Sequence, residues 1–319
     1  MNQPLLSVKD LSLEFIGARK IHALSSLSFD VVAGEVLVLL GESGSGKSVT
    51  LRSLLRLYGD HEARVSGEIL INGQNVLAMN NERLNQYRGA EVSMVFQEAG
   101  SAFDPVYTIG QQIVEFIMAH EAVGKDDAMK RALELLEMVK IPQAKQRLFT
   151  YPHELSGGMR QRAMIALALA CRPSILLADE PTTALDATVQ IQVLLLLREL
   201  QKEFNMAVIF VTHDIGAAVE IADNIAVMYA GNIIEQGGVR KIVRTPSHPY
   251  SAGLLASTVN GNLKGQRLLA IPGSPPNMGD NLVGCAFAPR CSRAEQGCYE
   301  AKPSLIAGAE GKVACWQPL

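Results

Sequence analysis

The chain has 319 residues, of which 48% are hydrophobic, and a formal net charge of −3 at pH 7. That length predicts about two structural units. The slightly acidic balance argues against a dedicated nucleic-acid-binding protein, which is usually basic. The first residues lack the basic region and apolar run of a signal peptide, and no uncharged apolar stretch reaches the ~18 residues of a membrane span. We therefore expect a chain that is not secreted and does not cross a membrane by itself.

The N-terminal segments are predicted to be β-strands. Residues 5–15 alternate apolar and polar side chains, as in a half-buried strand. Residues 22–35 favour a second strand that ends in a turn at Gly34. The run EVLVLL, residues 35–40, is continuously apolar after Glu35, which is typical of a strand covered on both faces.

The segment GESGSGKS, residues 41–48, fits the pattern G-x-x-x-x-G-K-[ST]. It lies between the strand at 35–40 and a predicted helix at 49–57, which is the context that a phosphate-binding loop requires. Its glycines let backbone N–H groups close around phosphate oxygens. Lys47 supplies a positive charge to the outer phosphates, and the Ser48 hydroxyl can bind Mg²⁺. A flexible glycine loop that matches by chance is the alternative, which the flanking elements disfavour.

Helical spacing dominates the middle of the chain. Residues 66–76 still favour a strand, with a turn at Asn72-Gly73. Residues 109–120, 128–140 and 159–170 then repeat apolar side chains with the period of a helix. We expect a helical subdomain, at about residues 100–172, inserted into an α/β core.

Acidic and imidazole side chains follow the next predicted strands. SILLADEP, residues 174–181, places Asp179 and Glu180 at the end of a buried strand, where ligands of parallel sheets bind. Asp179 is placed to hold Mg²⁺, and Glu180 to activate or orient a water. His213 ends a further strand and favours a γ-phosphate contact. The structural alternatives are a helix cap for the two acids and a plain strand-end histidine for His213.

Composition changes after Tyr250, where Gly, Pro and Asn become frequent. This change predicts a linker or a loop-rich appendage. We expect an ATPase domain over residues 1–255 and a loop-rich extension over residues 256–319. Four of the five cysteines lie in that extension.

With these motifs the chain strongly resembles the ATP-binding subunits of ABC transporters. LSGGMRQR, residues 155–162, is similar to the signature motif of that family, with Met159 where glutamine is common. VFQE, TTALD and VTHD match its Q-, D- and H-loops in the family's order. The resemblance implies a P-loop NTPase (ABC ATPase) α/β fold with an N-terminal antiparallel β subdomain.

The resemblance also implies a set of site residues. Gln97, Glu180 and His213 would take part in hydrolysis, and Ser48, Gln97 and Asp179 would hold Mg²⁺. Phe15 would stack on adenine, although a core phenylalanine on an edge strand is the alternative. The residues expected to contact ATP are Phe15, Gly41, Ser43, Gly44, Ser45, Gly46, Lys47, Ser48, Val49, Gln97, Ser156, Gly157, Gly158, Asp179 and Asp186.

The signature has a physical basis, because Ser156, Gly157 and Gly158 open a helix whose N–H groups form another anion site. In this family that site completes the nucleotide pocket of the opposite subunit. The resemblance therefore implies a head-to-tail ATPase pair, of two related chains in this subfamily. Its other partners would be two transmembrane permease subunits and an extracytoplasmic solute-binding protein. The chain would lie on the cytoplasmic face of the inner membrane.

The segments after Gln97 and near the C-terminus resemble importers of dipeptides, oligopeptides and nickel. Ala99 replaces a proline and Phe103 a leucine of the usual pattern, in a region that touches the membrane subunits. The function implied is an ATP-hydrolysing motor of a peptide-type importer. The alternatives are a soluble ABC ATPase that acts on ribosomes or DNA, and an exporter subunit. The single ATPase unit and acidic balance disfavour the former, and the importer-like segments disfavour the latter.

The four C-terminal cysteines, Cys285, Cys291, Cys298 and Cys315, could supply four thiolates to Zn²⁺ or to an iron–sulfur cluster. Their spacing alone does not choose between these metals. The family resemblance favours a [4Fe–4S] cluster. Zinc, disulfides and four free thiols stay open, with disulfides disfavoured in a reducing compartment. Cys171 is expected to be a buried packing residue on an apolar helix.

Overall fold

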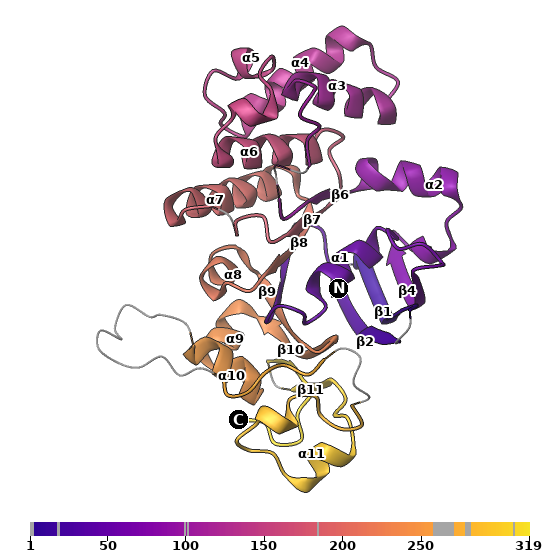
Figure 1. Ribbon diagram of the computed structural model, residues 1–319, viewed down its shortest axis with the longest axis vertical. Coiled ribbons are helices and arrows are strands. Elements are labelled where there is room, and N and C mark those ends of the chain that lie inside the picture. Colours follow the sequence, from indigo (N-terminus) through magenta and orange to yellow (C-terminus); the bar gives the residue numbers. More distant parts are fainter. Residues whose placement is uncertain are drawn as a thin grey trace. The chain divides into compact units, whose positions relative to one another are not determined.

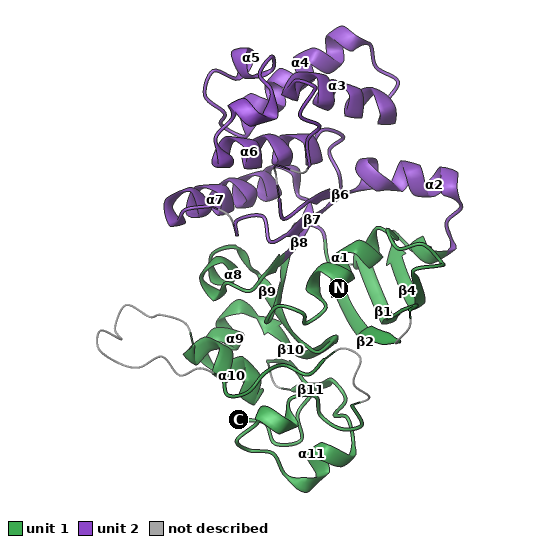
Figure 2. Ribbon diagram, viewed as in Figure 1, with its two compact units in different colours: residues 1–32, 36–77, 211–319 green, residues 33–35, 78–210 purple. Residues whose placement is uncertain are grey.

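In the computed structural model, the chain forms two compact units (Figures 1 and 2). Unit 1 comprises residues 1–32, 36–77 and 211–319, and unit 2 comprises residues 33–35 and 78–210. The residues that the structure describes are 3–17, 20–98, 100, 102–183, 185–257, 271–277, 282–308 and 310–319.

Unit 1 begins with a four-stranded antiparallel sheet, as predicted. Its strands are β1 (Leu6–Phe15), β2 (Ile21–Val31), β4 (Ala63–Ile71) and β5 (Gln74–Asn75), in the order β2-β1-β4-β5. The predicted turn joins β4 to β5, and both of its residues have positive φ (Asn72 +49°, Gly73 +79°). A two-residue turn of that hand matches the twist of paired strands, so the Asn-Gly pair explains the hairpin.

The second sheet of unit 1 contains the strand that precedes the phosphate loop. That strand, β3 (Val36–Leu40), is buried along its whole length and pairs in parallel with β9 (Asn224–Tyr229). Antiparallel strands continue the sheet from β9 in the order β10 (Asn232–Gly238), β12 (Gly311–Val313) and β11 (Ile306–Gly308). The remaining elements of unit 1 are α1 (Lys47–Leu54), η1 (Val76–Ala78, which ends in unit 2), α8 (Ile215–Ile221), α9 (Val239–Arg244), α10 (Pro249–Ala256), η4 (Ala288–Arg290) and α11 (Gln296–Glu300).

Unit 2 carries strands β6 (Val92–Val95) and β7 (Ile175–Asp179), which are parallel and fully buried. Strand β8 (Ala207–Thr212) neighbours β7 in the sheet, and its residues up to Phe210 belong to unit 2. The helical elements of unit 2 are α2 (Asn81–Gln86), η2 (Tyr87–Glu91), α3 (Ile109–His120), α4 (Lys125–Met138), α5 (Ala144–Arg147), η3 (Pro152–Glu154), α6 (Gly157–Ala168) and α7 (Ala187–Phe204).

The predicted helical insertion is present in unit 2, where α3, α4 and α6 pack together. Its first helix has the predicted bounds, because Thr108 and Gln111 form a capping box at its N-terminus. One detail of the expectation was wrong. Cys171 is buried, as expected, but it lies in the turn after α6 and not on the helix. The pKa of its thiol is raised to about 11, mainly by burial.

The C-terminal extension adds strands to the second sheet of unit 1. Residues Glu235, Gln236 and Gly237 of β10 pair with Val313, Lys312 and Gly311 of β12. Residues 258–270 and 278–281 of the extension lie outside the described residues, and so does Ala99. Within the described part of the chain, no helix combines the length and the apolar character that a membrane span requires. The boundary at residues 255 and 256 stays a prediction.

Candidate active site

The phosphate loop of unit 1 leads from β3 directly into α1. Gly44 (φ +79°) and Gly46 (φ +100°) adopt the left-handed conformation that glycine tolerates best, and Gly46 caps the helix. A Cβ atom at Gly41 would lie 2.3 Å from the Met228 carbonyl oxygen, on the neighbouring strand. The glycine positions of the motif are therefore required by the local backbone as well as by a bound phosphate.

Two polar side chains of this loop turn inward. The Lys47 ammonium is buried and donates hydrogen bonds to the Gly41 carbonyl (2.8 Å) and the Glu42 carbonyl (3.0 Å). Among the described residues, the Ser45 hydroxyl is buried and has no hydrogen-bond partner. Ser43 and Gly44 are exposed, and Ser48 and Val49 are half-buried. A buried hydroxyl without a partner is costly, so this loop is suited to a polar ligand such as a phosphate.

Two further predicted residues lie in unit 1. Phe15 ends β1 and is half-buried, with its ring edge-to-face against Tyr58 at a centroid distance of 5.2 Å. Adenine stacking by Phe15 stays a prediction, because packing against Tyr58 also suits a structural role. His213 follows the last residue of β8 and is exposed. Its neighbour Asp214 caps α8, because its carboxylate accepts a hydrogen bond from the Gly216 N–H (2.8 Å).

The two predicted acids lie at the end of β7 in unit 2. Asp179 is its last residue and is 2% exposed. Glu180 has a φ of +45°, which is strained for a side chain other than glycine. The Thr183 hydroxyl donates a hydrogen bond to the Glu180 carboxylate (2.9 Å). This contact was not predicted, although the motif TTALD contains the threonine.

The signature and the D-loop lie against each other in unit 2. Ser156 caps α6 by accepting a hydrogen bond from the Met159 N–H (3.3 Å). A Cβ atom at Gly158 would lie 2.7 Å from Cγ1 of Val189, in the first turn of α7. Asp186 caps α7 through a hydrogen bond from the Val189 N–H (3.0 Å). Asp186 therefore has a structural role in addition to the predicted nucleotide contact.

The predicted site residues divide between the two units. The phosphate loop, Phe15 and His213 belong to unit 1, and the acids, the signature and Asp186 belong to unit 2. Gln97 is also in unit 2, exposed just after β6. Each group has the local geometry described above, and their joint action on one nucleotide stays a prediction.

Comparison with known families covers both halves of the chain. Residues 24–183 match the model of the ABC transporter family. Residues 234–298 match the model named oligopeptide/dipeptide transporter, C-terminal region. The chain belongs to the ABC transporter ATP-binding proteins, in the oligopeptide/dipeptide subfamily. Its phosphate loop and signature are thus those of an ABC ATPase.

Relatives of this ABC ATPase match it over nearly its whole length. It is 44% identical over 317 residues to the oligopeptide transport ATP-binding protein OppD of Salmonella typhimurium, covering 99% of this chain and 94% of the relative. It is also 44% identical to the probable peptide ABC transporter ATP-binding protein y4tR of Sinorhizobium fredii, covering 98% and 95%. Among solved structures, a dimeric post-hydrolysis state of the ATP-binding cassette MJ0796, bound to ADP and Pi, matches with a TM-score of 0.66 and 29% identity. The match covers 74% of this chain and 99% of that one.

The four C-terminal cysteines lie in one short region of unit 1. All are free thiols, and the Cys285 N–H donates a hydrogen bond to the Cys298 carbonyl (2.7 Å). Burial raises the pKa of Cys285 and of Cys315, and neighbouring thiols of the set raise both further. The described residues include all four cysteines, yet no group of three or more His, Cys, Asp or Glu among them is arranged to hold a metal ion. The thiol chemistry suits a metal centre, but this arrangement is not a ligand set.

Two contacts on the phosphate loop were not predicted from the sequence. The Tyr250 hydroxyl of α10 accepts a hydrogen bond from the Glu42 N–H (3.0 Å), and Arg290 of η4 forms an ion pair with the Glu42 carboxylate (2.8 Å). Both partners lie more than 200 positions further along the chain. No local pattern around either residue indicates such a contact.

Proposed function

We propose that this ABC ATPase is the motor subunit of an importer for peptides or peptide-like solutes. The phosphate loop carries the proposal, because its left-handed glycines, its buried Lys47 and its Ser45 hydroxyl, which has no partner in the described part of the chain, suit a nucleotide phosphate. The capped N-terminus of α6 supplies a second anion site in the same chain. The peptide cargo is supported by the match of residues 234–298 and by the peptide transport proteins among the relatives.

The proposed cycle uses two ATPase subunits that face each other head to tail. ATP lies between the phosphate loop of one subunit and the Ser156–Gly158 signature of the other. ATP then favours the closed pair because it contacts both subunits only in that state. Hydrolysis removes these contacts, reopens the pair and drives the membrane subunits. A single isolated chain is expected to hydrolyse ATP poorly.

Each polar residue has a defined role in the hydrolytic step. Glu180 orients or activates the attacking water, His213 contacts the γ-phosphate, and Gln97 takes part in hydrolysis. Ser48, Gln97 and Asp179 would hold Mg²⁺, which their hard oxygen atoms suit, and Asp179 is buried where a strand ends. When bound, the ion would neutralise charge that develops on the phosphates.

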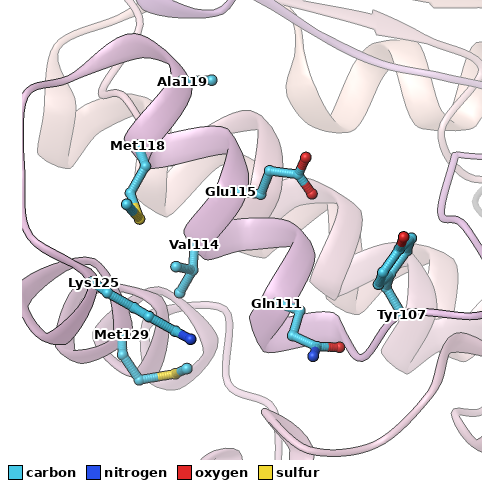
Figure 3. A pocket seen from close by; sticks show the side chains of 8 residues that line it. All are labelled: Tyr107, Gln111, Val114, Glu115, Met118, Ala119, Lys125 and Met129. Carbon is cyan, nitrogen blue, oxygen red and sulfur yellow. The ribbon is translucent and has the colours of Figure 1, made fainter.

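We infer that the membrane subunits dock on the helical insertion of unit 2. A cavity of about 540 Å³ lies on α3 and the start of α4, and Figure 3 shows Val114, Met118 and Met129 among the side chains that line it. Met118 is 45% exposed, although it is a large apolar residue. An apolar hollow of this kind fits a short cytoplasmic helix of a permease subunit.

The remaining partners are proposed from the subfamily. They are a second, related ATPase chain, two permease subunits and an extracytoplasmic solute-binding protein, with this chain on the cytoplasmic face of the inner membrane. The alternative of a soluble ABC ATPase acting on ribosomes or DNA is less well supported. The transporter match of the C-terminal region and the relatives' names both favour transport.

The experiment that tests the motor assignment uses Glu180→Gln in the assembled transporter. We expect turnover to fall about 10²-fold or more, because the water loses its base while the phosphate loop is intact. ATP binding should persist, and the ATP-bridged dimer should accumulate in size-exclusion chromatography. Thr183→Val, which removes only the hydroxyl that contacts Glu180, serves as the milder comparison. Parental turnover in Glu180→Gln would contradict the assignment.

We propose separately that the C-terminal thiols hold a [4Fe–4S] cluster, with Zn²⁺ as the alternative metal. The proposal is supported by four thiols gathered in one region, where burial and the neighbouring thiols raise the pKa of Cys285 and of Cys315. One observation opposes it, because no group of His, Cys, Asp or Glu among the described residues is arranged to hold a metal ion. The ATPase cycle proposed above does not pass through this centre.

Anaerobic purification with metal analysis tests the cluster. We expect about four iron atoms per chain and a broad visible absorbance, both of which Cys291→Ser should abolish. Cys171→Ser is the matched control, since it alters a buried thiol elsewhere and should keep the iron. One zinc per chain without colour would establish the alternative. A chain free of both metals would refute the proposal.

A further inference from the structure

Glu42 links the phosphate loop to parts of unit 1 that lie far along the chain. Its N–H donates a hydrogen bond to the Tyr250 hydroxyl (3.0 Å). Its carbonyl accepts hydrogen bonds from the Lys47 ammonium (3.0 Å) and from the Ser45 N–H (3.2 Å). The backbone of Glu42 is thus linked both to α10 and to the two polar residues that face the proposed phosphate site.

The Glu42 side chain is held by the C-terminal extension. Arg290 donates to both carboxylate oxygens, from Nη1 (2.8 Å) and from Nη2 (3.1 Å). The same guanidinium donates to the Pro272 carbonyl (2.8 Å) and to the Tyr229 hydroxyl (3.2 Å). Arg290 is 9% exposed. A buried, bidentate pair of this kind fixes the orientation as well as the charge of the carboxylate.

Aromatic packing connects the two groups that contact Glu42, the Tyr250 hydroxyl and the Arg290 guanidinium. The rings of Tyr229 and Tyr250 lie 4.6 Å apart, and Phe287 packs against each of them at 5.4 Å. All three rings are buried. The Arg290 guanidinium lies within 6 Å of the centres of the Tyr229 and Phe287 rings, at 5.8 and 5.9 Å. Arg290 and Tyr250 are therefore held by the same rigid cluster.

The charge of Glu42 gives this arrangement a consequence for binding. A nucleotide triphosphate is strongly anionic, and a carboxylate within the phosphate loop would repel it. Arg290 forms an ion pair with that carboxylate and so neutralises its negative charge. Without Arg290, the loop would keep the negative charge and lose the contact that orients it.

We propose that Arg290 is a positioning residue of the nucleotide site, which neutralises Glu42 and ties the phosphate loop to the C-terminal extension. The proposal rests on the function proposed above. It makes the extension part of the nucleotide site, although the extension lies far from every ATP motif in the sequence. Arg290 acts only through Glu42 and touches no nucleotide itself.

The test measures binding of a non-hydrolysable ATP analogue with Mg²⁺ to the full chain by calorimetry. We expect Arg290→Ala to raise Kd about tenfold, because the loop is displaced and carries an unpaired charge. The increase should shrink at high salt, which screens the repulsion. Arg131→Ala is the matched control, because it removes an ion pair with Glu121 (2.7 Å) in unit 2 and should leave Kd unchanged.

A double variant separates positioning from a general loss of stability. Glu42→Gln removes the negative charge, so Arg290→Ala combined with Glu42→Gln should bind several-fold more tightly than Arg290→Ala alone. A merely structural role for Arg290 predicts no such rescue. If Arg290→Ala does not fold, Arg290→Lys tests the positioning part of the proposal, because it keeps the charge but loses the bidentate geometry. It should raise Kd about threefold.

Two results would overturn the inference. One is a parental Kd in Arg290→Ala, or in Arg290→Lys where the alanine variant does not fold. The other is a double variant that binds as weakly as Arg290→Ala. If the parental chain itself failed to bind the analogue, the proposed function would fail instead. The parental titration therefore distinguishes the two failures.

Discussion

His248 is a residue whose titration should be visible in the stability of the whole chain. Its Nδ1 accepts a hydrogen bond from the Tyr250 N–H (3.0 Å) and so caps α10, which requires the neutral imidazole. Burial lowers its pKa to about 4, although the charge of Glu235 acts in the opposite direction. Within the described residues its Nε2 is buried without a partner. The folded state thus has no place for a second proton on this ring.

The sign of the pH effect follows from the lowered pKa. Between pH ~6.5 and pH ~4 the unfolded chain binds a proton at His248 that the folded chain does not. The free energy of unfolding should therefore fall as pH falls through this window, by about 3 kcal/mol in total. His248→Asn keeps a capping acceptor and should lose most of that dependence in urea unfolding followed over pH. Unchanged pH dependence would contradict the assignment, and His22→Asn, an exposed histidine, is the control.

Glu235 contributes to acid sensitivity at the acidic end of that window and below it. Burial acts to raise its pKa, but hydrogen bonds from Lys241 and from the N–H groups of Ser247 and His248 outweigh burial and lower it. A carboxylate whose pKa is lowered in the folded state stabilises the fold at a pH above its unfolded pKa. This stabilisation is lost as pH falls through the folded pKa. Comparing the parental chain with His248→Asn subtracts this contribution, because both retain Glu235.

Single residues of the site were predictable where a motif defines them. The glycines, Lys47 and Ser48 were predicted because a phosphate loop needs these residue types between a strand and a helix. The bond from Thr183 to Glu180 and the cap made by Asp186 were not predicted. Side-chain geometry of this kind depends on the path of a turn, which a single sequence does not specify.

At the scale of elements, helix α3 is the most informative. Its bounds were predicted from apolar spacing, and the Thr108–Gln111 capping box explains why the helix begins where it does. The apolar face of this amphipathic helix packs on α4 and α6. Met118, on the same helix, is nevertheless exposed in the cavity of Figure 3.

We expect Met118→Glu to weaken association with the membrane subunits by roughly tenfold or more, because a charge enters an apolar contact without a partner. Co-purification of the tagged transporter measures this directly, and binding of ATP to the isolated chain should not change. Leu195→Glu, at a similarly exposed position on α7 (48%), is the matched control. Equal recovery of the membrane subunits with Met118→Glu would exclude this cavity as their docking site.

At the scale of the whole molecule, the strands and helices next to the motifs followed from the sequence, because apolar periods and turn signals mark them. The contacts of the C-terminal extension did not follow from the sequence, because the residues that it contacts lie far away along the chain. The contact between Glu42 and Arg290 spans 248 positions, and nothing near either residue indicates the other. The four cysteines were predicted as one group, and the structure places them in one region, where no ligand set is present among the residues it describes.

The pairing of β12 with β10 has a practical consequence for any shortened chain. Ending the chain after α10 would remove β11 and β12 and leave the N–H and C=O groups of β10 along Glu235–Gly237 without their present partners. An open edge next to buried Ile233 and Ile234 is a template for pairing with a second molecule and hence for aggregation. The three-residue strand β11, exposed and ending in glycine, is a much poorer template. By covering this edge of β10, the extension lowers the tendency of the chain to aggregate through edge-to-edge strand pairing.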